Sequence, residues 1–164
     1  MRAWLTALLL LLVAWAGASN FEILDYEVDG VLRPTGHVGV TERITVHFNV
    51  PQRGIFRTIP FAYARPQGGT RNLVISDVRV QGGPMHLSTK AGNLVIRIGD
   101  PDVVLPAGTE MTYVIAYELY GAINRIPQNG AWEPSAELYW TAIGTDWPTA
   151  IPLAKVTLRF KARS

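Results

Sequence analysis

The feature that most constrains this chain is an alternation of apolar and polar side chains that runs from Val38 to Val50. The apolar members are Val38, Val40, Ile44, Val46, Phe48 and Val50, and the polar members are Thr41, Arg43, Thr45 and His47. Successive side chains of a β-strand point to opposite faces, so the pattern predicts a strand with one face in a core. An amphipathic helix needs apolar residues three and four positions apart, which no window of about a dozen residues provides.

The same alternation recurs along the chain and predicts an all-β protein. Two more long strands begin at Met111 and Ala154, and the second turns Ala154, Val156, Leu158 and Phe160 toward the core. Shorter candidates are Phe21 to Val28, Ile55 to Ile59, Leu73 to Val80, His86 to Lys90, Leu94 to Ile98 and Glu137 to Ala142. Turns rich in Gly, Pro and Asn separate them, and residues 120–134 form the longest stretch without strand character.

About eight or nine short strands in one chain of this length predict an antiparallel β-sandwich, immunoglobulin-like or jelly-roll-like, and a closed barrel is the alternative. The sandwich is expected to occupy residues 19–164 as a single domain.

The N-terminus is typical of a secretory signal peptide. Arg2 precedes an apolar run over residues 3–14, and the small residues Ala16-Gly17-Ala18 form a cleavage site after Ala18. The run is shorter than the roughly 20 residues that a spanning helix needs, although an uncleaved anchor is the alternative. The sequence therefore predicts a signal peptide over residues 1–18 and an extracytoplasmic location, whether secreted, periplasmic or at the cell surface.

Composition excludes several classes of protein. The chain has no cysteine, so it has neither a disulfide framework nor a lipidated cysteine anchor. Its 15 Lys and Arg residues nearly balance its 13 Asp and Glu residues, which leaves no electrostatic footprint for nucleic acid. No second apolar run long enough to cross a bilayer follows Ala18. We expect membrane association only if the signal is uncleaved or a transmembrane segment follows downstream.

Two charged residues break the alternation. Glu42 has the parity of Val40 and Ile44, and Arg57 lies between Ile55 and Ile59, so both charges should point into the core. A single buried charge is costly, which predicts that Glu42 and Arg57 form a structural ion pair between neighbouring strands. The alternative is that a bulge near Thr41 turns Glu42 to solvent and that Arg57 extends out from an edge strand.

The segment Glu137-Leu-Tyr-Trp-Thr-Ala-Ile-Gly-Thr-Asp-Trp147 is unusually aromatic for a loop. A glycan-binding surface would use the residues Trp132, Tyr139, Trp140, Asp146 and Trp147. A glycan hydrolase would instead use carboxylates from Glu133, Glu137 and Asp146. Strand parity favours a third interpretation, in which Trp140 packs into the core.

Other polar groups give weak signals. The three histidines have neither zinc-ligand spacing nor a nucleophile beside them, so no metal and no catalytic residues are predicted from them. Asp100 and Asp102 supply too few oxygens for calcium, and Asp100 is expected to cap its own turn. No cofactor is expected.

Several motifs occur in the order found in a known family. They are Asp29-Gly30 with Val40-Thr41-Glu42, Arg53-Gly-Ile-Phe-Arg-Thr-Ile-Pro60, Ile96-Arg-Ile-Gly-Asp-Pro-Asp102, Thr112-Tyr-Val-Ile-Ala-Tyr117 and Glu137 to Trp147. Together they resemble the N-terminal domain of the predicted bacterial membrane proteins catalogued as domain of unknown function 2207. The resemblance implies a signal peptide, an extracytoplasmic β domain, membrane helices that follow it, and no established activity. It places Glu42 and Arg57 at framework positions of the family.

Three hypotheses for function follow. The first is a non-catalytic extracytoplasmic β-sandwich module of a cell-envelope protein, which mediates protein interaction or envelope organisation. The second is a module that binds glycan or cell wall through the aromatic segment, and the third is a carboxylate hydrolase. The expected partner is another envelope protein or a cell-wall component. The sequence leaves open whether the chain is part of a membrane protein or a stand-alone secreted domain.

Overall fold

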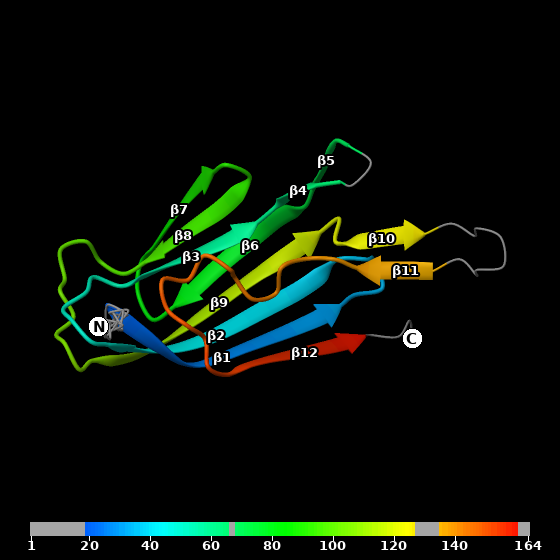
Figure 1. Ribbon diagram of the computed structural model, residues 1–164. Coiled ribbons are helices and arrows are strands. Elements are labelled where there is room, and N and C mark those ends of the chain that lie inside the picture. Colours follow the sequence, from blue (N-terminus) through cyan, green and yellow to red (C-terminus); the bar gives the residue numbers. More distant parts are fainter. Residues whose placement is uncertain (1–18, 66–67, 127–134, 161–164) are drawn as a thin grey trace, which may run out of the picture.

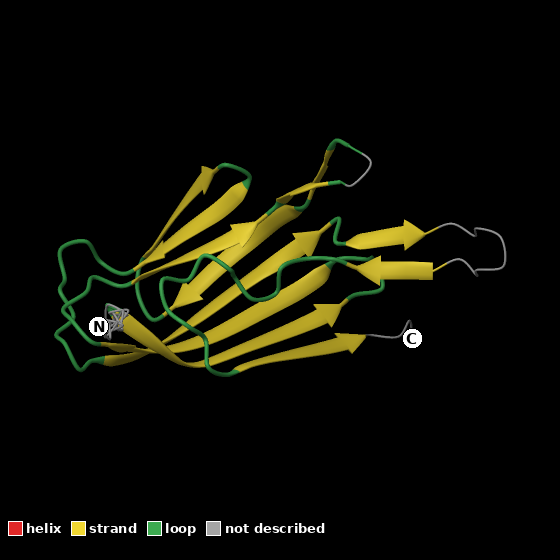
Figure 2. Cartoon of the chain, viewed as in Figure 1, coloured by secondary structure: helices red, strands yellow, loops and turns green. Residues whose placement is uncertain are grey.

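The computed structural model describes residues 19–65, 68–126 and 135–160, and these form strands and loops without a helix (Figures 1 and 2). The all-β prediction is therefore confirmed for this part of the chain. The first six strands are β1 (Phe21–Leu32), β2 (Val38–Phe48), β3 (Ile55–Pro60), β4 (Ala62–Ala64), β5 (Thr70–Asn72) and β6 (Val74–Gln81). The others are β7 (Met85–Lys90), β8 (Asn93–Ile98), β9 (Glu110–Tyr120), β10 (Ile123–Ile126), β11 (Ser135–Leu138) and β12 (Ala154–Phe160).

The strands form two main sheets and two short hairpins. A five-stranded sheet has the order β12-β1-β2-β9-β6, and a three-stranded sheet has the order β3-β8-β7. The pairs β4-β5 and β10-β11 form the hairpins. The described residues thus contain twelve strands where about eight or nine were expected, because the short ones carry too few residues to show alternation. One of them, β10, lies in the stretch that was predicted to lack strand character.

The prediction that all strands pair antiparallel is wrong at one edge. β12 runs parallel to β1, with Val28 opposite Val156 and Leu32 opposite Phe160. Parallel neighbours cannot be joined by a tight turn, and here β1 and β12 lie near opposite ends of the described chain, with β2 to β11 between them. The last connection, over residues 139–153, leads from β11 to β12. In Figure 1 this connection crosses over β1 and β2 before the chain enters β12.

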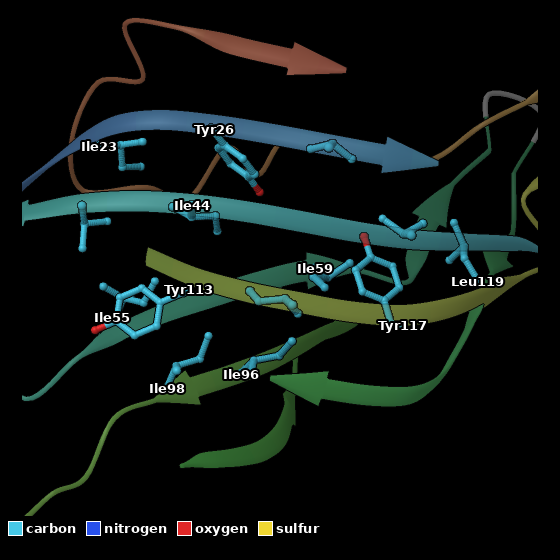
Figure 3. Packing of buried hydrophobic residues seen from close by; sticks show 14 of the residues in the cluster. Ile23, Tyr26, Ile44, Ile55, Ile59, Ile96, Ile98, Tyr113, Tyr117 and Leu119 are labelled. Carbon is cyan, nitrogen blue, oxygen red and sulfur yellow. The ribbon is translucent and has the colours of Figure 1, made fainter. Parts of the chain in front are cut away.

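The two main sheets share one hydrophobic core. Its buried residues include Ile23 and Tyr26 of β1, Ile44 of β2, Ile59 of β3 and Ile96 of β8 (Figure 3). On the five-stranded sheet the connection 139–153 adds half-buried side chains, among them Trp140 and Trp147. The predicted alternation of β2 is confirmed as far as Phe48, because Val38, Val40, Ile44, Val46 and Phe48 are all buried. It is wrong for Val50, which lies beyond the end of β2 and is 40% exposed.

β12 departs from its predicted burial. Val156, Leu158 and Phe160 share a face with the core residues of β1, as predicted, yet they are 42%, 42% and 71% exposed. The reason is position, because β12 is the outermost strand and the three-stranded sheet lies on the other side of the molecule (Figure 1).

Candidate functional site

The most unusual feature of the interior is a charged centre between the two main sheets. Glu42 points inward from β2 and Arg57 points inward from β3, and both side chains are fully buried. No bulge disturbs β2 at Glu42, which pairs in regular register with Val28 on one side and Ile115 on the other. The structure therefore brings together the two residues that the sequence predicted to meet, and the alternative of solvent-exposed charges is wrong. They belong to different sheets, however, and not to neighbouring strands of one sheet.

Glu42 is surrounded by hydrogen-bond donors. Arg57 holds it in a two-pronged arrangement, with Nε donating to Oε2 at 2.7 Å and Nη2 donating to Oε1 at 2.9 Å. The hydroxyl of Tyr26 donates to Oε2 at 2.6 Å, and that of Tyr117 donates to Oε1 at 2.9 Å. The two tyrosines approach from β1 and β9, on either side of β2 (Figure 3). Each carboxylate oxygen thus accepts two hydrogen bonds, which compensates its loss of water.

The charge of Glu42 shapes the titration of its neighbours. Burial and the adjacent carboxylate raise the pKa of Tyr26 far above its ordinary value of 10.0, and the same causes raise the pKa of Tyr117. Burial acts to lower the pKa of Arg57, but the charge and hydrogen bonds of Glu42 outweigh it and the pKa rises. Both phenols are therefore neutral donors and the guanidinium is cationic across the physiological range.

The aromatic segment closes the other side of Arg57. Its Nη1 donates to the carbonyl of Thr58, and its Nη2 donates to the carbonyl of Ala142 at 3.4 Å. Gly144 lies so close that a Cβ at this position would overlap Nη1. This close approach explains why a glycine interrupts the aromatic segment, because only a residue without a side chain lets the loop cover the guanidinium.

Replacing Tyr117 with Phe is expected to lower the free energy of unfolding by about 1.5 to 3 kcal/mol at pH 7, because Glu42 loses a charge-assisted hydrogen bond. The raised pKa of the buried phenol gives a second readout. The neutral Tyr117 hydroxyl makes its full contribution to the free energy of unfolding below pH 10. That contribution is lost as the pH rises toward the folded-state pKa. The variant should therefore lose stability less steeply above pH 10. Urea titrations at pH 7 and pH 10.5 measure both effects, and Tyr120→Phe, exposed on the same strand, should change neither.

The described members of the predicted aromatic surface do not form one platform. Trp147 is half-buried and packs edge-on against Tyr26 and Phe21, with ring centroids 5.8 and 6.5 Å away. Trp140 is half-buried, and its indole lies 3.6 Å from the place where a Cβ of Gly30 would be. The interpretation of Trp140 as a packing residue is thus supported. Tyr139 is 51% exposed and contacts the ring of Tyr63, while Trp132 lies outside the described residues.

Of the carboxylates proposed for a hydrolase, the two within the described residues, Glu137 and Asp146, are not brought together. Glu137 lies on β11 and accepts a hydrogen bond from Asn124 at 3.3 Å. Asp146 lines a hollow together with Ser19 and Asn20, at the beginning of β1. β11 and the beginning of β1 are at opposite ends of the molecule in Figure 1, so Glu137 and Asp146 cannot act on one bond. Glu133 lies outside the described residues.

Asp100 behaves as the sequence predicts. Its Oδ1 accepts a hydrogen bond from the backbone N–H of Asp102 at 2.9 Å, which caps the turn after β8. Within residues 19–65, 68–126 and 135–160, no three His, Asp or Glu side chains gather closely enough to hold a metal ion.

Two groups of residues with a clear structural context were missed from the sequence. Tyr26 and Tyr117 complete the charged centre, and their position on apolar strand faces was the signal that could have found them. Phe56 was also missed. It is 61% exposed on β3, and it lines two hollows of about 420 and 230 Å³. A third hollow of about 590 Å³ lies on the outer face of the five-stranded sheet beside the ion pair of Arg33 and Glu118.

Residues 22–164 match a family model described as the N-terminal domain of a predicted membrane protein, DUF2207. The chain belongs to this family. The match contains Glu42, Arg57 and both tyrosines of the charged centre, and the DUF2207 domain is all-β in its described part. No helix among the described residues is long and apolar enough to cross a membrane. No curated protein matches the chain.

Solved structures similar to this DUF2207 domain include an M1 zinc metallopeptidase from Deinococcus radiodurans. The match has 11% identity and a TM-score of 0.39, and it covers 62% of this chain and 21% of the peptidase. A mutant of that enzyme bound to a Tyr-Ser-Ala substrate matches with 12% identity and a TM-score of 0.39, over 70% of this chain and 24% of the other. The chain thus spans about a fifth to a quarter of these peptidases, and so remote a likeness carries no functional argument.

Proposed function

We propose that this DUF2207 domain is a non-catalytic, extracytoplasmic β-sandwich module that binds an extended segment of another cell-envelope protein. The single observation that carries the proposal is the exposed edge strand β12. Its inner face presents Val156, Leu158 and Phe160 to solvent, and the neighbouring Leu153 is 63% exposed. Contiguous exposed apolar side chains commonly mark interaction sites.

The edge position of β12 supports strand addition as the mode of binding. β12 pairs with β1 on one side and has no strand partner on its other side among the described residues. An unpaired edge presents backbone N–H and C=O groups that can pair with an incoming strand. Alternate side chains of that strand would then lie on the same side of the sheet as Val156, Leu158 and Phe160.

The polar face of β12 indicates the chemistry of the partner. Lys155 and Arg159 lie on this face and contact Glu27 and Asp29 of β1 at 4.0 and 3.0 Å. A strand beside β12 would bring its own side chains next to both cations. A second copy paired antiparallel about Thr157 would place Lys155 opposite Arg159, so like charges disfavour it. A segment that alternates apolar with acidic residues fits both faces.

Site-specific photocrosslinking in intact cells tests the proposal. A photoreactive residue at Phe160 is expected to crosslink to an envelope protein, through a segment that alternates apolar and acidic residues. The same residue at Val74, which is 60% exposed on the opposite edge strand β6, should give no such product. Phe160→Lys should abolish partner binding while the domain keeps its stability. Equal products from both positions, or crosslinks only between copies of this chain, would contradict the proposal.

A further inference from the structure

A second surface on the opposite sheet has different chemistry. Phe56 points away from the core, between the buried side chains of Ile55 and Arg57. Its cross-strand neighbour on β8 is Arg97, which in turn lies opposite His86 of β7. The exposed ring therefore stands on the outer face of the three-stranded sheet, beside a guanidinium.

Phe56 lines both hollows, which also share residues 52, 54 and 55, so the two hollows adjoin at this residue. We call the two hollows together the Phe56 groove. The larger hollow, about 420 Å³, is lined by the hydrogen-bonding side chains of Asn20, Gln52, Thr58 and Asp146. The smaller hollow, about 230 Å³, is lined by Arg53, Arg97 and Pro101.

Charge divides the groove along its length. Arg53 and Arg97 line the smaller hollow, and neither forms an ion pair with another described residue. The Nε of Arg97 is buried and has no hydrogen-bond partner among the described residues. Asp146 lines the larger hollow, together with residues that carry amide and hydroxyl groups. A ligand with its negative charge at one end and neutral hydroxyls at the other would match this arrangement.

We propose that the Phe56 groove binds an anionic glycan. The apolar face of a sugar ring would stack on Phe56, and the sugar hydroxyls would face Asn20, Gln52 and Asp146. A carboxylate or phosphate substituent would lie against Arg53 and Arg97, because planar guanidinium groups pair well with such oxyanions. This site is separate from the β12 edge, so it adds a function to the proposed one and each can fail without the other.

Isothermal titration of the purified chain with oligogalacturonate tests this inference. Neutral cello-oligosaccharide of equal length and poly-glutamate are the comparison ligands. We expect binding of the acidic sugar, at least tenfold weaker binding of the neutral sugar and of poly-glutamate, and a decline with added salt. Phe56→Ala should weaken binding of the acidic sugar at least tenfold, as should the double variant Arg53→Gln/Arg97→Gln. Val74→Ala removes an equally exposed apolar side chain from the other sheet and should change nothing.

Each outcome of this titration supports or contradicts the binding of an anionic glycan. Because Phe56 is exposed, its replacement should leave the fold intact, and an unchanged melting temperature establishes this. No heat of binding at millimolar acidic sugar would overturn the proposal. Undiminished binding by Phe56→Ala would show that the ring is not part of the site. Tight binding of poly-glutamate would show that the site is a nonspecific cationic patch. Equal binding of neutral sugar would refute the role of the arginines.

Discussion

Replacing Glu42 with Gln is expected to lower the free energy of unfolding by about 3 to 5 kcal/mol. The substitution keeps the size of the side chain but leaves the guanidinium of Arg57 fully buried without its counter-ion. A domain of this size has a total stability of about 5 to 15 kcal/mol, so the loss is a large fraction of the whole. Urea unfolding followed by tryptophan fluorescence measures it, because Trp147 packs on Tyr26 beside the charged centre.

The matched controls separate the pairing from the mere presence of charges. Arg57→Met should be similarly destabilising, since it leaves the Glu42 carboxylate without its cation. The double variant Glu42→Gln/Arg57→Met should be less destabilised than the sum of the two single variants, because neither charge then remains buried alone. Glu27→Gln removes an exposed partner of Lys155 and should cost under about 1 kcal/mol. A negligible shift of the urea midpoint in Glu42→Gln would contradict a stabilising role for the pair.

Replacing Gly54 with Ala is expected to cost about 2 to 6 kcal/mol, through backbone strain together with overpacking. Gly54 precedes β3 with φ +127°, and Gly99 follows β8 with φ +135°. The two backbones pass so closely that a Cβ on Gly54 would overlap the carbonyl oxygen of Ile98 and lie 2.9 Å from Cα of Gly99. Backbone atoms cannot move aside as a flexible side chain would, so the ends of β3 and β8 would have to separate.

Gly36→Ala is the control for this prediction. Gly36 also has a positive φ, +85°, but a Cβ there would have no neighbour within 4 Å. It should therefore show the strain alone, about 1 to 2 kcal/mol. Thermal unfolding of both variants at matched concentration measures the difference. An equal decrease in the free energy of unfolding in the two variants would mean that the close approach of Gly54 to Ile98 does not add to the cost of a Cβ.

The charged centre shows what the alternation of side chains along a strand can predict and what it cannot. Parity showed that Glu42 and Arg57 point inward, and the cost of burying an unpaired charge then predicted their contact. Parity could not show that the two strands belong to facing sheets, because alternation carries no information on which strands are neighbours. Tyr26 shares the apolar parity of Val28, which could have revealed it, but it does not share the parity of Ile23. The register of β1 shifts between Ile23 and Asp25, so Ile23 and Tyr26 are both buried although strict alternation puts them on opposite faces.

The aromatic segment from Glu137 to Trp147 was only partly predictable. The sequence predicted a strand as far as Ala142, whereas β11 ends at Leu138 and the rest of the segment is a loop over the core. The inward packing of Trp147 depends on rings from β1, more than a hundred residues earlier in the chain. The neighbouring residues in the sequence do not reveal such contacts, which is why Trp147 was named only as a candidate glycan-binding residue.

The sequence by itself determined the all-β class, the inward face of β2 and the identity of the two buried charges. These properties depend on the two-residue alternation of side chains along a strand and on the cost of burying a charge. Both can be judged from neighbouring residues in the sequence. Only the tertiary structure decided that the charges join two sheets, that β12 lies parallel to β1 with its apolar face uncovered, and that Phe56 lines two hollows. These properties depend on which distant segments become neighbours, and the packing of the whole chain determines those neighbours.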